Sequence, residues 1–199
     1  MKKDRKNIIL ESLASMLEER NMSKVTTALL AEKSGITEAA LYRHFPSKRA
    51  IYAELFSFCD NAIFSKCNEL KKEKLSSKDK IKNSFLFFMI FVEKNKGFAR
   101  LLSREALSSD EQNVSDNVNQ FYERLELFFR QVLKEDSDNL VTQPGVSAQL
   151  IVTALEGNVS RYIRSKFKDA PSSYIENIWQ LLATTCLLYT SDAADEVLG

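Results

Sequence analysis

The sequence predicts an all-α protein of about nine helices, with an N-terminal three-helix unit followed by an antiparallel helical bundle. Apolar residues recur at helical spacing along nearly the whole chain, and no segment shows the alternation of a half-buried strand. Only 5 Gly and 3 Pro interrupt the 199 residues, which favours long helices joined by short loops. Hydrophobic residues make up 44% and charged residues 28% of the chain, which is enough apolar material for a globular core.

Four helices are predicted in the first part of the chain. The first covers residues 4–21, where the apolar side chains fall on one stripe. Two short helices follow over residues 27–33 and 37–43, and the turn between them contains Gly35. Ser47 is a suitable N-cap and begins a long helix.

The rest of the chain continues the helical pattern. Ser77 is the expected N-cap of a helix that carries the aromatic run of residues 85–92, and residues 94–97 are expected to end that helix. Residues 136–144 are predicted to form a loop. The remaining predicted helices cover residues 98–107, 110–135, 146–168 and 172–185.

Composition and motifs exclude several classes of function. The net charge is only +1, so any nucleic-acid contact must come from a local patch. No apolar signal core follows the basic N-terminus, and the apolar run at residues 85–92 is too short to span a bilayer, so neither export nor membrane insertion is expected. Three sparse cysteines suit a reducing cytoplasm. There is no Gly-rich phosphate loop, nucleophile elbow or CxxC pair, and His44 is the only histidine, so we expect no enzyme, no cofactor and no metal site.

The most informative pattern is residues 26–48, TTALLAEKSGITEAALYRHFPSK. Two short helices are joined by a tight turn, for which Gly35 supplies a left-handed backbone. Leu30, Ile36 and Leu41 are spaced to form a small core. The second helix then presents its polar side chains outward, and its N-terminal N–H groups suit a phosphate. A helix of this size fits the major groove of B-DNA.

This run resembles the helix-turn-helix of the TetR family of regulators, which ends in a Leu-Tyr-x-His-Phe box, here at residues 41–45. The resemblance implies that Thr37 and Ala40 face base edges. It also implies that Tyr42, His44 and Lys48 meet phosphates. For Tyr42 the alternative is a core position, and for His44 it is a structural role. The expected DNA-binding residues are Thr26, Thr27, Thr37, Glu38, Ala40, Tyr42, Arg43, His44 and Lys48.

Segments outside the helix-turn-helix resemble one branch of that family, the nucleoid occlusion factors. These segments are residues 119–124, 130–133 and 156–168. The resemblance implies a cytoplasmic, nucleoid-associated protein that binds chromosomal operators and, while bound, inhibits assembly of the FtsZ division ring. The alternative is a ligand-responsive transcriptional repressor of the TetR type, which needs an open, polar-lined pocket among its middle helices.

A groove between the long helix after the helix-turn-helix and the aromatic helix is the hypothesised site for the C-terminal tail of FtsZ. Ordinary surface and core positions are the alternative for each of its residues. The large rings of residues 85–91 are expected to fill the interior, so we expect no small-molecule ligand. The expected partner-binding residues are Phe58, Phe64, Lys66, Lys94 and Asn95.

Specific recognition of DNA points to a homodimer. A single recognition helix contacts only a few base pairs, and two of them related by a two-fold axis match a palindromic operator with half-sites about one helical turn apart. The last two helices are the expected interface, where small residues allow close approach within a four-helix bundle. Its expected residues are Leu150, Ala154, Gly157, Arg161, Ile175 and Trp179.

These expectations divide the chain into three parts. Residues 1–47 form the helix-turn-helix DNA-binding domain, and residues 48–185 form the helical regulatory and dimerisation domain. Residues 186–195 read CLLYTSDAAD, which resembles the translation of a transposase adapter used in sequencing libraries. We therefore expect residues 186–199 to be a non-native tail, the alternative being a genuine polar extension.

Overall fold

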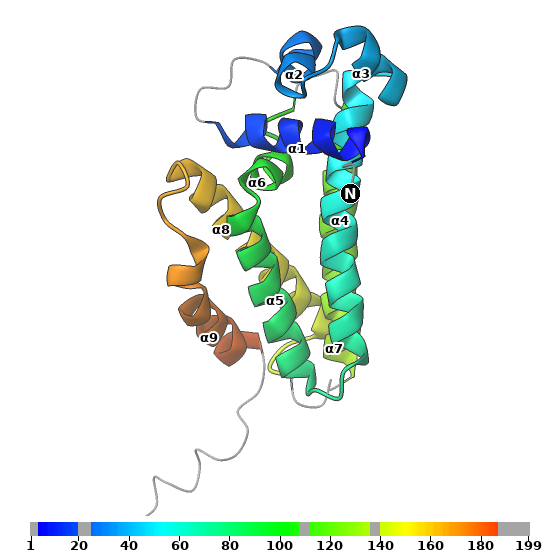
Figure 1. Cartoon of the computed structure of the whole chain (residues 1–199). Coiled ribbons are helices and arrows are strands. Elements are labelled where there is room, and N and C mark those ends of the chain that lie inside the picture. The colour runs from blue at the N-terminus through cyan, green and yellow to red at the C-terminus, as the bar shows by residue number, and fades with distance from the viewer. Residues whose placement is uncertain (1–3, 20–24, 108–111, 136–139, 187–199) are drawn as a thin grey trace, which may run out of the picture.

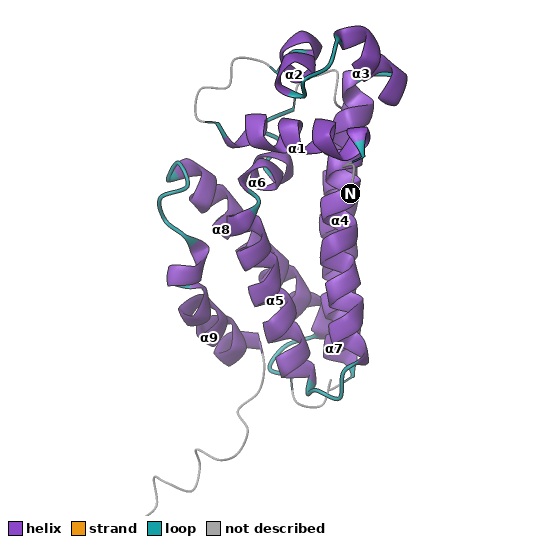
Figure 2. Ribbon diagram, viewed as in Figure 1, coloured by secondary structure: helices purple, strands orange, loops and turns teal. Residues whose placement is uncertain are grey.

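The computed structural model describes residues 4–19, 25–107, 112–135 and 140–186. Within these ranges the regular structure is nine α-helices and one 3-10 turn, with no strand (Figures 1 and 2). The predicted all-α fold is therefore confirmed. Most of the tail expected to be non-native, residues 187–199, lies outside the described part, while Cys186 is the last residue of the last helix.

The N-terminal unit lies at one end of the molecule. It consists of α1 (Arg5–Glu18), α2 (Thr27–Lys33) and α3 (Glu38–His44), which gather around the start of the long α4 (Lys48–Lys72) (Figure 1). Each short helix buries few side chains. The completely buried ones include Leu30 of α2 and Leu41 of α3, as the small predicted core requires.

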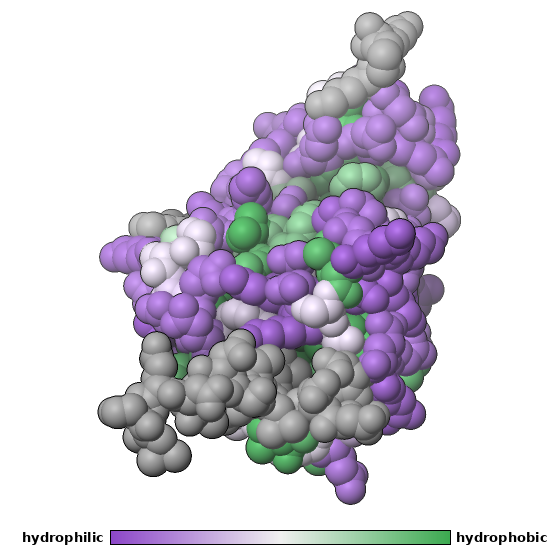
Figure 3. Space-filling model, turned by 90° about the horizontal axis from the view of Figure 1, so that it is seen from below, coloured by the Kyte–Doolittle hydropathy of each residue, from purple (hydrophilic) through white to green (hydrophobic). Residues whose placement is uncertain are grey.

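The larger body is built around α5 (Ser77–Lys94), which packs against α4, α7, α8 and α9. Its other elements are α6 (Lys96–Leu102), α7 (Gln112–Lys134), α8 (Pro144–Arg164), η3 (Pro171–Ser173) and α9 (Ile175–Cys186). Seen from below, the lower end of this body is largely hydrophilic, with smaller hydrophobic areas between the polar side chains (Figure 3).

Aromatic rings hold the body together. Phe121 of α7 is completely buried and has four phenylalanine rings from α4, α5 and α6 with centroids 5.5–6.1 Å from its own. Phe85 and Phe88 of α5 are also completely buried, which confirms that these large rings occupy the interior. Such interlocking contacts make the body the main source of apolar burial.

Two helix N-caps were predicted from the sequence, and the structure confirms one of them. The Ser47 hydroxyl accepts a hydrogen bond from the Ala50 backbone N–H at 3.1 Å and begins α4. The expectation for α5 was wrong by one residue, because Ser76 caps this helix by accepting from the Asp79 N–H at 3.1 Å. Neighbouring serines cannot be distinguished by type alone, since either hydroxyl can cap.

Several predicted boundaries were wrong. Helix α6 ends at Leu102 rather than at residue 107, and α9 begins at Ile175 rather than at residue 172. The first helix ends at Glu18 rather than near residue 21. Helix α8 begins at Pro144, which suits the first helical turn, and ends at Arg164 rather than residue 168. After it, Lys166 and Phe167 both adopt left-handed backbone, with φ of 56° and 61°. These two residues reverse the chain without glycine, so the sequence carried no stop signal there.

The segment expected to end α5 proved to be a junction between two helices. Only Asn95 separates α5 from α6, and Gly97 lies inside α6. A Cβ atom added at Gly97 would lie 2.8 Å from the Ala14 carbonyl oxygen. Gly97 is therefore required because α1 and α6 approach closely, not because the chain turns there.

Candidate nucleic-acid interface and adjoining cavity

The turn between α2 and α3 sets the geometry of the candidate interface. Gly35 has a φ of +66°, as predicted, and the Ile36 N–H donates to the Ala31 carbonyl at 3.0 Å. The Ser34 hydroxyl donates to the Leu30 carbonyl at 2.6 Å, which closes the end of α2. The Thr37 hydroxyl then accepts from the Ala40 N–H at 3.2 Å and begins α3. This sequence of local bonds fixes α3 against α2.

The outward face of α3 carries the side chains expected to meet DNA. Tyr42 is 47% exposed, and Glu38 and Arg43 are also exposed, whereas Ala40 and His44 are half-buried. Since α3 is short and uncovered on this face, its side chains are available to a groove of DNA. The structure therefore brings most of the predicted set onto one surface.

Three of these side chains form a chain of hydrogen bonds between α2 and α3. The Tyr42 hydroxyl donates to Thr27 Oγ1 at 3.5 Å, and the Thr27 hydroxyl donates to the Glu38 carboxylate. Thr26 plays a different part, because its hydroxyl accepts from the Leu29 N–H at 3.2 Å and caps α2. The sequence indicated these residues but not their pairing.

Two cations lie on aromatic rings beside the end of α3. Lys48 Nζ lies 5.2 Å from the centroid of the Tyr52 ring, and Lys6 Nζ lies 5.5 Å from that of Phe45. Both distances suit a cation–π interaction, which helps to hold each lysine in place. Lys6 at the start of α1 thus joins Lys48 at the edge of the candidate interface.

A cavity of about 280 Å³ lies between the N-terminal unit and the body. Its apolar lining comes from α1, α4 and α6, and it includes Leu10, Leu55 and Phe98. Two carboxylates of α1, Glu11 and Glu18, also line it. On sequence alone the α1 residues were indistinguishable from an ordinary core stripe, so their part in this cavity was missed.

Cys59 lines the same cavity with a buried thiol. Burial, and to a smaller extent the charge of Asp60, raises the pKa of this thiol to about 12. The thiol is therefore protonated at neutral pH and acts as an apolar lining group rather than a nucleophile.

The partner groove was predicted between α4 and α5, whereas the cavity is walled by α1, α4 and α6, and only two of the predicted residues line it. Phe58, which is 67% exposed, and Asn95 both line the cavity. Phe64 does not line it; its ring packs 5.5 Å from Phe121 and lies under the Arg124 guanidinium at 3.9 Å. The expected placement of Phe64 is corrected, because this residue faces α7. Of the two expected lysines, Lys66 pairs with Glu69 at 2.6 Å and Lys94 is exposed at the end of α5.

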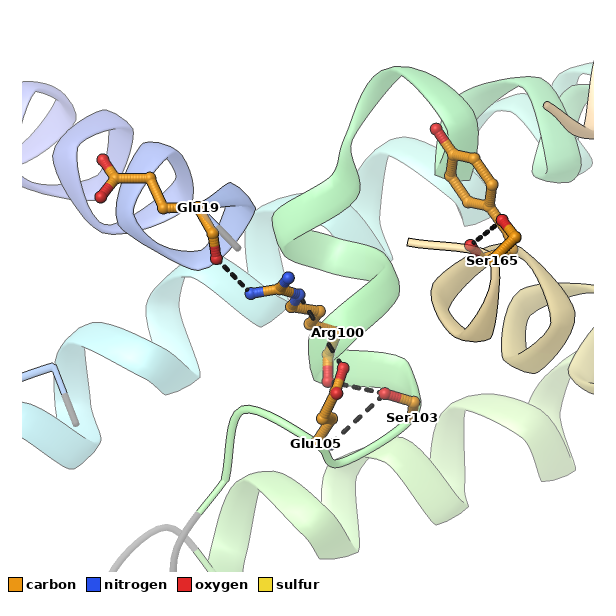
Figure 4. Close-up of polar contacts among 6 residues, drawn as sticks. Glu19, Arg100, Ser103, Glu105 and Ser165 are labelled. Atoms are coloured by element: carbon orange, nitrogen blue, oxygen red, sulfur yellow. Dashed lines mark hydrogen bonds and ion pairs between the residues drawn. The ribbon is translucent and has the colours of Figure 1, made fainter. Parts of the chain in front are cut away.

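Arg100 of α6 joins the N-terminal unit to the body (Figure 4). Its Nη1 donates to the Glu19 carbonyl at 2.7 Å, and its Nε lies 3.8 Å from a Glu105 carboxylate oxygen. The guanidinium carbon also lies 5.2 Å from the centroid of the Phe167 ring. Arg100 therefore contacts both Glu19, which follows α1, and Phe167, which follows α8.

The residues expected at the dimer interface fall into two groups. On α8, Leu150, Gly157 and Arg161 are exposed and Ala154 is half-buried. In contrast, Ile175 and Trp179 of α9 are 2% and 3% exposed within their own chain, and the Trp179 ring lies 5.9 Å from Phe85. These two are corrected to core residues of the protomer. The outward apolar residue of α9 is instead Leu181, which is 66% exposed.

None of the described helices is long and apolar enough to cross a membrane. Nor do the described residues contain a group of three or more His, Cys, Asp and Glu side chains that is arranged to hold a metal ion.

The fold and the exposed helix-turn-helix define a helical DNA-binding regulator. Residues 9–55 match the family described as bacterial regulatory proteins of the tetR family. Residues 76–186 match the SlmA-like family, described as a tetracyclin repressor-like C-terminal domain.

Relatives and solved structures agree with this class. The nucleoid occlusion factor SlmA of Vibrio vulnificus is 35% identical over 187 residues, covering 92% of this chain and 95% of that protein. SlmA of Colwellia psychrerythraea is 36% identical over 186 residues, covering 92% of this chain and 94% of that protein. The chain belongs to the SlmA family of nucleoid occlusion factors, within the TetR family.

FadR from Bacillus halodurans has the same fold, with a TM-score of 0.75 at 14% identity over 92% of this chain and 96% of its own. NalD of Pseudomonas aeruginosa also has this fold, with a TM-score of 0.74 at 13% identity over 93% of this chain and 96% of its own.

Proposed function

We propose that this protein binds palindromic operators in double-stranded DNA as a homodimer and, from the nucleoid, inhibits assembly of the FtsZ ring. Identity of about 35% over nearly the whole chain to proteins named nucleoid occlusion factors carries this proposal. We assign DNA binding to residues 1–47 and regulation and dimerisation to residues 48–185. Three observations support this proposal. The geometry of α3 supports DNA binding, the exposed face of α8 supports the homodimer, and the cavity supports the contact with FtsZ.

The DNA-binding part rests on α3 and its surroundings. Thr37, Glu38 and Tyr42 lie along the outward side of α3, with Thr27 beside them on α2. Arg43, His44 and Lys48 extend this surface toward α4 and supply groups that suit phosphate oxygens. Since the net charge of the chain is only +1, this local placement of cations matters more than the overall field.

The homodimer part rests on an uncovered apolar stripe. Val146 and Leu150 of α8 are 54% and 39% exposed, and Leu181 of α9 is 66% exposed. Nothing lies within 4 Å of a Cβ atom added at Gly157 in the same α8 face. An open face with apolar and small residues suits close packing against the same helices of a second copy.

The partner part rests on the cavity with Phe58 at its edge. A large, exposed aromatic side chain beside an apolar cavity is a typical anchor for a short peptide. We propose that the C-terminal tail of FtsZ inserts apolar side chains here. Asn95 fixes the cavity wall, because its side-chain amide donates to the Phe91 carbonyl at 2.8 Å. Lys66 and Lys94 are proposed to attract acidic residues of the tail from outside the cavity.

A peptide titration tests the partner part. Fluorescence anisotropy with a labelled FtsZ tail peptide should show that Phe58→Ala weakens binding by about 10-fold or more, as for an interface anchor. Leu127→Ala is the matched control, since Leu127 is an exposed apolar residue, 42% exposed, on α7. Lys66→Glu and Lys94→Glu should each weaken binding less than Phe58→Ala. Unchanged affinity for Phe58→Ala would contradict the cavity as the peptide site, provided its thermal unfolding matches that of the wild type.

Genomic binding profiling in the native host tests the function as a whole. A nucleoid occlusion factor should occupy many sites over the chromosome while sparing its terminus. A single site beside one transporter or enzyme gene would instead support a ligand-responsive repressor. Size-exclusion chromatography with light scattering gives the oligomeric state in the same preparation.

A further inference from the structure

The hydrogen-bond chain from Tyr42 through Thr27 to Glu38 has a fixed direction. A carboxylate only accepts hydrogen bonds, so the Thr27 proton must point to Glu38. The oxygen of Thr27 then accepts the Tyr42 proton. Each hydroxyl has one proton, and both protons are used within the protein. Neither Thr27 nor Tyr42 can therefore donate to a phosphate while this chain is intact.

Docking on DNA changes what the Glu38 carboxylate faces. If Thr27 turns its proton to a phosphate, Glu38 loses its donor, whereas Tyr42 can leave Thr27 without breaking that bond. Phosphate oxygens offer no proton and repel a carboxylate. A carboxylate that is desolvated without a donor is strongly unfavourable, so Glu38 needs a donor from the DNA itself.

The major groove offers only two kinds of base donor. These are the exocyclic amino groups of cytosine N4 and adenine N6. Adenine places its N7 acceptor beside the amino group, which disfavours a carboxylate, whereas cytosine presents its amino group without that neighbour. Glu38 is the first residue of α3, and the N-terminal end of a recognition helix is the part that contacts base edges.

We propose that Glu38 selects a cytosine in each operator half-site, and that its bond to Thr27 links this selection to the seating of the phosphates. On a matching site the cytosine amino group replaces the Thr27 hydroxyl as the donor to Glu38. The Thr27 hydroxyl is then free to donate to the DNA backbone. On any other base the carboxylate keeps Thr27, and the phosphate contact of Thr27 is lost. This inference rests on the proposed DNA-binding function.

Selection from a library of duplexes tests the proposal. The library is randomised over about two helical turns, the span of a dimer's operator. Wild-type protein should enrich a palindrome with one cytosine per half-site whose preference disappears with Glu38→Gln. Glu32→Gln, an exposed glutamate on α2, is the matched control and should keep every preference. Thr27→Val should lower affinity mainly on the cytosine sites, where Thr27 binds phosphate, and should still prefer that cytosine, because the carboxylate remains.

A modified base then tests the chemistry directly. N4-methylcytosine keeps Watson–Crick pairing but occupies the major-groove position of the amino proton. At the selected position it should weaken wild-type binding by about 10-fold or more, the effect of losing a specific base contact. Binding of Glu38→Gln should change by no more than about 2-fold, because this variant no longer depends on that single donor.

Several outcomes separate this inference from the function on which it depends. Identical preferences for wild type and Glu38→Gln would overturn it, as would adenine at the selected position. Loss of the cytosine preference in Thr27→Val would show that Glu38 only joins α2 to α3, and would also overturn it. If wild-type protein enriches no sequence at all, the proposed operator binding fails as well. Circular dichroism melting of each variant confirms folding, which is expected to be intact because Glu38 is exposed.

Discussion

The helix-turn-helix pair, α2 and α3, and the aromatic body, α4–α9, are stabilised in different ways. The pair buries three side chains along its two helices, Leu30, Ala31 and Leu41. Its geometry comes instead from caps, the Gly35 turn and hydrogen bonds between side chains. In the body, rings from four helices interlock around Phe121. The surface proposed to contact DNA therefore lies on the part with the smallest core, where polar side chains remain exposed.

Phe121→Ala should produce the largest loss of stability among the variants that test this difference. Removing a completely buried ring at the centre of the body is expected to lower the free energy of unfolding by about 3–5 kcal/mol. Urea unfolding followed by circular dichroism measures it. Phe58→Ala is the control, since this exposed ring should change stability by no more than about 0.5 kcal/mol. Similar losses for the two variants would contradict an aromatic core centred on Phe121.

Gly97→Ala should have an intermediate effect, because it disturbs the contact between the two regions. The new methyl group would lie 2.8 Å from the Ala14 carbonyl oxygen, so α1 must shift away from α6. A loss of about 1–3 kcal/mol in stability is expected. DNA affinity should fall as well, since α1 supports α2 and α3. Gly145→Ala is the matched control, because its nearest contact would be an ordinary 3.9 Å. Equal stability of both variants would show that α1 tolerates the shift.

Gly35→Ala should have the smallest effect of the three. Nothing lies within 4 Å of an added Cβ atom, so the loss comes only from the left-handed backbone, with φ of +66°. About 1 kcal/mol is expected. Gly35→Asn should lose less, since asparagine tolerates this conformation better than alanine. Thermal unfolding of the two variants gives the comparison. The reverse order would mean that packing, rather than backbone conformation, requires glycine here.

Many features of the fold followed from local sequence. The cap at Ser47, the left-handed Gly35 and the buried rings of Phe85 and Phe88 agree with prediction. The sequence also predicted that the polar side chains of the candidate interface share the outward face of α3. What could not be predicted was the pairing of Thr27 with Glu38, because it joins residues that only the turn brings together.

Residues whose environment depends on distant helices were harder to assign. Trp179 was expected between two protomers and is instead buried against Phe85 of its own chain. Phe64 was expected in the groove between α4 and α5 and instead packs against Phe121 of α7. In both cases an amphipathic stripe indicates that a side chain is buried, and it says nothing about which neighbour buries it.

The sequence by itself determined where α2 and α4 begin, where the chain turns between α2 and α3, and which side chains avoid water. These features depend on atoms only a few residues apart, so short-range capping, backbone conformation and apolar periodicity decide them. Only the tertiary structure decided that Gly97 permits the approach of α1 to α6, that Phe58 borders a cavity and that Leu181 rather than Trp179 faces outward on α9. Those outcomes depend on how whole helices pack, and packing is settled by the summed fit of many side chains far apart in the chain.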